Sequence, residues 1–296
     1  MLKHNNIIRN SEKYRNEVRL YWERIGPDFY VNGAPPAYIS GESKAIYEKI
    51  FKSKISQGDT TLVLGTTPAL RDLLGSFDSA NWVADFSDNG FSMTERVLSP
   101  AVRAKEDYFI GDWLKLETRF AKESLKLVTG DLIFRQMPLE DGKNLISVID
   151  AILSSDGVFV LRSSSRNLRW RSVSCGEILN LGLKLDRRSD IKKRLAVTLT
   201  VFRLRDRWTD ESGRVRINKL KAELFDTLNA NGNPWLAEFG SGVLNYMTEP
   251  PLVSWTHLSE AQFMELISDR FIIEHEFHAM DYPDAEFFPI YVLKKK

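Results

Sequence analysis

Cysteine, histidine and long apolar runs are all scarce in this sequence of 296 residues. Cys175 is the only cysteine, so the chain can form neither an intrachain disulfide nor a zinc or iron–sulfur site built on cysteines. No stretch of about 18 apolar residues is present, and residues 1–19 are charged where a signal peptide would be apolar. We therefore expect a cytoplasmic protein without a membrane partner.

The four histidines do not form a pattern typical of a metal site. Residues 274–278 contain two histidines and two glutamates, but His275 and His278 would point to opposite faces of a strand. No third ligand is evident, and we expect no metal.

The net charge is +1, but the charge is unevenly distributed. Residues 166–250 carry 16 basic and 10 acidic side chains, whereas residues 251–293 carry one basic and 8 acidic side chains. The two segments could attract each other within the fold, or the basic segment could bind an anion. The net charge near zero and the lack of a long basic run argue against nucleic acid as a partner.

Short apolar runs that alternate with helical segments predict a doubly wound α/β sheet. The run at residues 60–64 consists of apolar and β-branched residues, which is typical of a strand buried on both faces. The expected strands lie at residues 60–64, 81–86, 107–111, 125–134, 158–161, 271–277 and 289–293.

This pattern divides the chain into four parts. We expect a helical cap at residues 1–57, the core of the sheet at 58–165, a largely helical insertion at 166–250, and at 251–296 the helix and strands that complete the sheet. The insertion follows the fifth strand, whose carboxyl end borders the crevice where such sheets bind ligands. We therefore predict that it forms a mobile lid over the site.

The first candidate ligand-binding segment is the turn that ends the first strand. Gly65 lets the backbone turn sharply and approach a ligand, and Thr66, Thr67 and Pro68 lead into the next helix. A plain turn would show the same pattern.

The second candidate is Asp85, at the end of the second strand and 20 residues after Gly65. A carboxylate at this spacing can accept hydrogen bonds from the hydroxyls of a ribose. A helix N-cap is the alternative interpretation.

The ends of the third and fourth strands also carry acids. Asp112 could accept a hydrogen bond from the amino group of an adenine, while Trp113 or Phe86 could cover the ring. Asp131 would lie at the open crevice of the sheet. A loop acid and a core tryptophan would explain Asp112 and Trp113 equally well.

The order and spacing of these segments resemble the class I S-adenosylmethionine-dependent methyltransferases over about residues 58–165 and 255–293. Residues 62–71 (LVLGTTPALR) are similar to a bacterial variant of the first motif of that family. The resemblance implies a Rossmann-like sheet that ends in an antiparallel hairpin, and S-adenosylmethionine as the cofactor. The cofactor-binding residues that it implies are Gly65, Thr66, Thr67, Pro68, Asp85, Phe86, Ser87, Met93, Asp112, Trp113 and Gly130.

The catalytic candidates are Asp131 and His257. The resemblance places Asp131 beside the reactive methyl group, and His257 could face the crevice as a general base, although a surface or capping histidine is the alternative. The sequence Asn-Pro-Pro-Tyr, which would indicate an amino-group acceptor, is absent after the fourth strand.

Arginines of the insertion are candidates for binding a carboxylate or phosphate of the substrate. They are Arg203, Arg205, Arg207, Arg214 and Arg216. Cations near the C-terminus of a helix can also serve only the helix dipole.

Three functions fit these observations. The first is methylation of a small, anionic molecule. The second is methylation of RNA or protein, with the basic insertion as the docking surface. The third is a sensor or scaffold that binds a nucleotide-like ligand without catalysis, which Thr67 and Ala69 favour because they replace two glycines of the family motif.

Overall fold

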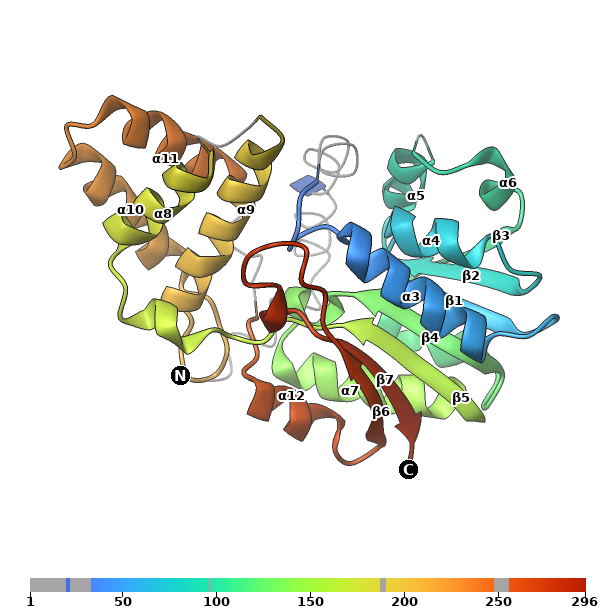
Figure 1. The fold of residues 1–296 in the computed structure, drawn as a ribbon. Coiled ribbons are helices and arrows are strands. Elements are labelled where there is room, and N and C mark those ends of the chain that lie inside the picture. The colour runs from blue at the N-terminus through green and yellow to red at the C-terminus, as the bar shows by residue number, and fades with distance from the viewer. Residues whose placement is uncertain (1–19, 22–32, 96, 187–189, 248–255) are drawn as a thin grey trace.

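The computed structural model describes residues 20–21, 33–95, 97–186, 190–247 and 256–296. Its centre is a seven-stranded sheet with the order β3-β2-β1-β4-β5-β7-β6 (Figure 1). The strands are β1 (Thr60–Leu64), β2 (Ala80–Asp85), β3 (Glu106–Ile110), β4 (Leu125–Asp131), β5 (Leu153–Arg162), β6 (Phe271–Phe277) and β7 (Ile290–Lys295). The first five strands are parallel, whereas β7 pairs antiparallel with both β5 and β6. The predicted sheet with an antiparallel C-terminal hairpin is confirmed.

Helices flank the sheet and form a second group at one end of the molecule. Those near the sheet are α3 (Gly41–Lys54), α4 (Pro68–Leu74), α5 (Asp88–Thr94), α6 (Pro100–Arg103), α7 (Leu139–Ile152) and α12 (Glu260–Ile267). The second group comprises α8 (Cys175–Asp186), α9 (Asp190–Arg207), α10 (Ile217–Asn229) and α11 (Pro234–Tyr246). Short 3₁₀ helices are η1 (Trp113–Thr118), η2 (Ile133–Gln136), η3 (Leu168–Arg171) and η4 (Ala285–Phe287).

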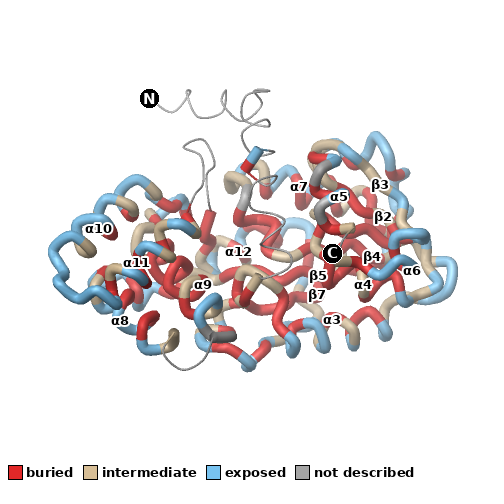
Figure 2. The backbone as a smooth tube through the Cα atoms, turned by 90° about the horizontal axis from the view of Figure 1, so that it is seen from above, coloured by how far each residue is buried: buried red, intermediate tan, exposed pale blue. Residues whose placement is uncertain are grey.

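Each face of the sheet has its own apolar core, because successive residues of a strand point to opposite sides. Leu62 and Leu64 belong to the core that α7 and α12 cover, whereas Val63 belongs to the core that α3 and α4 cover. The central strands are therefore buried on both faces, as the red segments of Figure 2 show. This burial explains why they stand out in the sequence as continuous apolar runs.

Helices α8 to α11 enclose a separate apolar core, and Figures 1 and 2 both show them grouped at one end of the molecule. Helix α9 also contacts the sheet domain. Leu199 and Phe202 of α9 form a small buried cluster with Leu132, which directly follows β4, and with Tyr282 and Phe288. The insertion thus packs beside the carboxyl end of β4, while its mobility as a lid stays a prediction.

Strands β4 and β5 differ from the sequence-based expectation. Strand β5 begins at Leu153, before the expected start at residue 158. Strand β4 ends at Asp131 instead of continuing to Phe134, because Leu132 adopts a left-handed backbone conformation (φ 53°) and starts η2. Helix α11 lies in the segment that was predicted to be largely helical, and Asn233 caps it by accepting a hydrogen bond from the Trp235 N–H at 3.1 Å. Within the described residues, no helix is long and apolar enough to cross a membrane.

Candidate functional site

The turn after β1 and the end of β2 lie against each other. Gly65 has a φ of +85°, which favours glycine, and its N–H donates a hydrogen bond to a carbonyl of β2. The carboxyl group of Asp85 accepts a hydrogen bond from the Ser87 N–H at 3.1 Å and is also hydrogen-bonded to the backbone of Phe86 and Thr66. Asp85 therefore joins the two turns, and the structure brings these predicted residues together.

Two polar groups at this junction have properties suited to a ligand. Burial raises the pKa of Asp85 to about 6, although its hydrogen bonds to backbone N–H groups and the charge of Arg71 act in the opposite direction. The hydroxyl of Ser87 is buried, and within the described residues it has no hydrogen-bond partner. A buried hydroxyl without a partner is unusual, and a bound molecule could satisfy it.

The other residues of the predicted first and second motifs occupy helix starts. Thr67 is the N-cap of α4 and Pro68 is its first residue, but the Thr67 side chain makes no capping hydrogen bond. Ser87 precedes α5, and Met93 belongs to that helix. The side chain of Met93 lies outside the described part of the structure.

The residues after β3 form one wall of this junction. The indole Nε1 of Trp113 donates to the Ala84 carbonyl at 2.9 Å, and the ring lies over Gly65, 3.7 Å from the position that a Cβ would take there. Asp112 caps η1 by accepting a hydrogen bond from the Leu114 N–H at 3.0 Å. Asp112 thus caps a 3₁₀ helix in the loop after β3, while Trp113 lies directly over the Gly65 turn.

Asp131 is held by a two-point ion pair. Arg162, at the end of β5, donates from Nε and Nη2 to the two carboxylate oxygens at 2.6 and 2.9 Å, and its side chain is fully buried. The carbonyl of the neighbouring Gly130 accepts a hydrogen bond from the Tyr47 hydroxyl at 3.2 Å. Both carboxylate oxygens are thus engaged by the guanidinium. This geometry favours a positioning role for Asp131.

His257 is buried between the core and the insertion, not exposed to the crevice. Its Nδ1 lies 2.8 Å from Asp206 of α9, and its Nε2 contacts the guanidinium of Arg135 in η2. Arginine can only donate, so Nε2 must accept, and the imidazole proton resides on Nδ1 and is donated to Asp206. Because both ring nitrogens are engaged, the predicted role of His257 as a general base is not supported.

The five arginines proposed to bind substrate do not converge. Arg203 donates to Asp284 at 2.7 Å, and Arg207 donates to Glu223 at 3.0 and 2.7 Å. Arg205 is buried, with its guanidinium 5.9 Å from the ring of Phe202. Arg203 and Arg207 are thus neutralised within the fold.

The last two of these arginines lie at the surface. Arg214 and Arg216 are exposed in the segment before α10, and Arg216 lies 3.5 Å from Asp210. The expectation that the five act together on one anion is therefore corrected, since three of them lie in ion pairs with three different acids.

Sequence reasoning overlooked three residues that the structure places at the carboxyl ends of β4 and β5. Arg162 ends β5, Arg135 belongs to η2, and Asp206 of α9 contacts His257, which in turn contacts Arg135. A signal for Arg162 was present, because it directly follows the apolar run at residues 158–161, just as Asp85 ends β2. Nothing in the sequence indicates that Asp206 would join them.

No protein-family model and no curated protein matches the sequence. Solved structures do match. A protein from Rhodobacter sphaeroides that is provisionally assigned as a Zn-dependent alcohol dehydrogenase is 15% identical, with a TM-score of 0.58 over 97% of this chain and 100% of that one. A SAM-dependent methyltransferase from Methanosarcina mazei is 13% identical, with a TM-score of 0.50 over 83% and 96% of the two chains.

A third similar structure is the magnesium protoporphyrin IX methyltransferase of Synechocystis, solved with bound S-adenosylhomocysteine (SAH). It is 11% identical, with a TM-score of 0.50 over 95% of this chain and 97% of that one. Likenesses at these identities show the fold. The chain has the Rossmann-like fold of the S-adenosylmethionine-dependent methyltransferases, with antiparallel strands at the C-terminus.

Proposed function

We propose that this protein is a methyltransferase that binds S-adenosylmethionine at the carboxyl ends of β1 to β4 and methylates a small, anionic molecule. The observation that carries the proposal is the junction of the Gly65 turn with the Asp85 carboxyl group, on a sheet in which β7 runs antiparallel between β5 and β6. A sheet that binds nicotinamide dinucleotides typically has six strands in the order 3-2-1-4-5-6. The antiparallel β7 therefore favours the methyltransferase over the dehydrogenase named among the similar structures.

The proposal assigns a role to each of the residues around the Gly65 turn. The carboxylate of Asp85 accepts a hydrogen bond from the ribose, and the buried Ser87 hydroxyl supplies a second polar contact. Trp113 and the exposed edge of Phe86 border the adenine, and Asp112 accepts from its amino group. These residues fit the cofactor, because the left-handed conformation of Gly65 lets the turn beside them approach a ligand closely.

When bound, the cofactor supplies a methyl group on a sulfonium, which is already activated for displacement. The protein then needs mainly to align the acceptor with that group, an effect worth about 7–11 kcal/mol. Asp131 and Arg162 contribute by fixing the ends of β4 and β5 against each other, and the buried Arg162 also donates to the Pro36 carbonyl at 2.8 Å.

The ion pairs of the insertion favour a small molecule over RNA as the acceptor. A docking surface for RNA needs cations that are available to phosphates. Arg203 and Arg207 already pair with acids, and Arg216 lies near Asp210. Binding of RNA in the micromolar range, with an affinity that falls steeply as salt rises, would reverse this preference.

Titration calorimetry with S-adenosylmethionine and SAH tests the cofactor site. We expect the wild type to bind both, and Asp85→Ala to bind roughly ten- to hundredfold more weakly, because losing a hydrogen bond to a charged group costs about 1.5–3 kcal/mol. Asp107→Ala is the matched control, since Asp107 is exposed near the amino end of β3 and pairs in register with Trp82, not with Asp85. A wild type that binds neither compound, or an Asp85→Ala variant of undiminished affinity, would refute the proposed site.

The affinity for SAH should also depend on pH. The carboxyl group of Asp85, with a pKa of about 6, is ionised at pH 7.5 and protonated at pH 5. The ribose hydroxyls donate to the ionised form, so the affinity should fall as the pH drops through 6. Asp85→Asn should have a weaker affinity that changes little between pH 5 and 7.5. Equal pH profiles for the two proteins would show that another group controls binding.

A further inference from the structure

Asp131 lies at the point where sheets of this kind bind their ligands. The order of the strands changes direction between β1 and β4, and an open parallel sheet binds ligands outside the carboxyl ends of its strands at such a point. Leu64 of β1 pairs in register with Gly130 of β4. The residues that follow them, Gly65 and Asp131, therefore flank this point from its two sides.

The ends of β2, β1 and β4 form a continuous row, because these three strands are neighbours in the sheet. Asp85 ends β2, the Gly65 turn follows β1, and Asp131 ends β4. A ligand that starts at Asp85 and crosses the Gly65 turn thus reaches Asp131 next. In S-adenosylmethionine the sulfonium is attached directly to the ribose, so a ribose at Asp85 brings the positive charge of the cofactor toward the end of β4.

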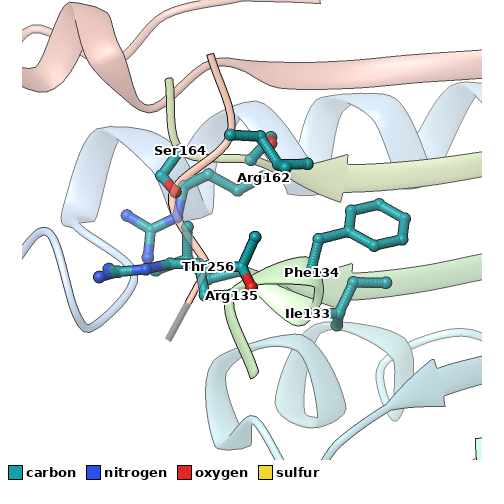
Figure 3. A pocket seen from close by; sticks show the side chains of 9 residues that line it. Ile133, Phe134, Arg135, Arg162, Ser164 and Thr256 are labelled. Atoms are coloured by element: carbon teal, nitrogen blue, oxygen red, sulfur yellow. The ribbon is translucent and has the colours of Figure 1, made fainter. Parts of the chain in front are cut away.

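Arg162 neutralises Asp131 and is itself held in place. The two side chains are 0% and 6% exposed, so little water screens their charges from a neighbouring ligand. Besides its two bonds to Asp131, Arg162 donates to the Pro36 carbonyl at 2.8 Å, and its Nη1 lies 3.5 Å from the hydroxyl of Tyr282. Figure 3 shows the side chain of Arg162 at the end of β5, where it also lines a small pocket. The guanidinium charge is therefore fixed beside Asp131.

The other ionisable groups that face Asp131 are tyrosines. Tyr47 reaches it from α3, Tyr38 from the segment before α3, and Tyr282 from the loop between β6 and β7. Burial raises the pKa of Tyr38 and Tyr47, and the charge of Asp131 acts in the same direction. Burial also raises the pKa of Tyr282 to about 12, although Arg162 opposes this shift. The three hydroxyls stay neutral near pH 7, so the ion pair determines the charge at the end of β4.

We infer that Arg162 is a positioning residue that keeps the site of methyl transfer electrically neutral through its ion pair with Asp131. The inference rests on the proposed function, which brings the sulfonium to this end of the sheet. In methyl transfer a lone pair of the acceptor forms the new bond, and the electron pair of the broken bond between methyl and sulfur stays on the sulfur. The sulfur thus loses its positive charge.

An unpaired carboxylate at the end of β4 would work against this reaction in two ways. It would stabilise the charged reactant more than the transition state, in which the charge on sulfur is already partly lost, and so raise the barrier. It would also repel an anionic acceptor. Arg162 removes both effects while Asp131 keeps its place at the end of β4.

Titration calorimetry with S-adenosylmethionine and SAH on the full chain tests this inference. The two compounds differ in the methyl group and in the positive charge that it gives to the sulfur, so the ratio of their affinities reports the charge around the sulfur. Arg162→Gln should shift this ratio at least fivefold in favour of S-adenosylmethionine. Asp131→Asn should shift it at least fivefold in favour of SAH, because the guanidinium is then uncompensated. The double variant Arg162→Gln/Asp131→Asn should return the ratio to within about twofold of the wild type.

Two further variants separate this role from a merely structural one. Arg162→Lys keeps the charge, so its ratio should stay within about twofold of the wild type even if both affinities fall. Lys126→Gln is the matched control, because Lys126 pairs with Asp156 near the amino end of the same strand β4.

Asp131→Asn changes little in shape, so it keeps the test decisive if Arg162→Gln does not fold. An unchanged ratio in Asp131→Asn, or shifts in the same direction in the two single variants, would overturn the inference and leave the proposed cofactor site intact. A wild type that binds neither compound would instead refute the proposed function, and the inference with it.

Discussion

Asp206→Asn should make the stability of the protein fall as the pH drops below about 6.5. In the native state, burial and the charges of Arg135, Arg205 and Arg166 hold the pKa of His257 well below its ordinary value of 6.5. Below pH 6.5 the unfolded chain therefore binds a proton on this histidine that the native state does not bind. The free energy of unfolding should decrease by up to about 1.4 kcal/mol for each pH unit in that range.

In His257→Gln, the stability should instead fall as the pH rises. Burial raises the pKa of Asp206 from 3.8 to about 7, and Asp284 contributes in the same direction, although Arg135 and Arg166 oppose it. Between about pH 4 and 7 the native state then keeps a proton on Asp206 that the unfolded chain has lost. The free energy of unfolding should decrease as the pH rises through this window, with a slope of the same size.

In the wild type, these two groups together should leave the free energy of unfolding almost independent of pH between about pH 4 and 6.5. In that range the native state carries one extra proton on Asp206 and lacks one on His257, so the two contributions cancel. Urea unfolding followed by circular dichroism at pH 4.5, 5.5, 6.5 and 7.5 measures all three proteins. If the free energy of unfolding changed with pH in the same direction in both variants, His257 and Asp206 would not have the shifted pKa values on which this prediction rests.

The architecture of the sheet could be predicted because its signals are local. A strand buried on both faces has few exposed positions, and Thr60–Leu64 shows this in the sequence as two β-branched threonines followed by three apolar residues. The end of β4 could not be predicted in this way. Leu132 and Ile133 are as apolar as the strand before them, and only the left-handed conformation of Leu132 turns the chain away from the sheet.

In the candidate site, too, some residues could be predicted from local signals and others could not. Asp85 and Gly65 were identified from their positions at the ends of strands, and the structure places them together. The engagement of His257 depends on Asp206 and Arg135, which are 51 and 122 residues away in the chain. Such long-range contacts leave no periodic pattern in the sequence, so a histidine whose nitrogens are both taken looks the same as one that faces a crevice.

Arg71 shows how a residue of a motif can serve the scaffold instead of the ligand. It lies in the segment that resembles the first methyltransferase motif, yet its side chain is fully buried. Its Nη2 lies 2.7 Å from Glu106 of β3, and it also hydrogen-bonds to the hydroxyls of Thr94 in α5 and Tyr108 in β3. It therefore ties α4 to the two elements that flank the Asp85 turn.

We accordingly expect Arg71→Ala to lower the free energy of unfolding by about 3–5 kcal/mol, because it leaves the buried carboxylate of Glu106 without its cation. The double variant Arg71→Met/Glu106→Leu should recover most of this loss, since it removes both charges and fills the space with apolar side chains. Lys52→Ala is the control, as Lys52 and Glu48 form an exposed pair on α3 whose loss should change the stability little. Urea unfolding of the four proteins at pH 7.5 measures these differences. If Arg71→Ala lost no more stability than Lys52→Ala, or if the double variant lost more than Arg71→Ala, the buried ion pair would not be what holds α4, α5 and β3 together.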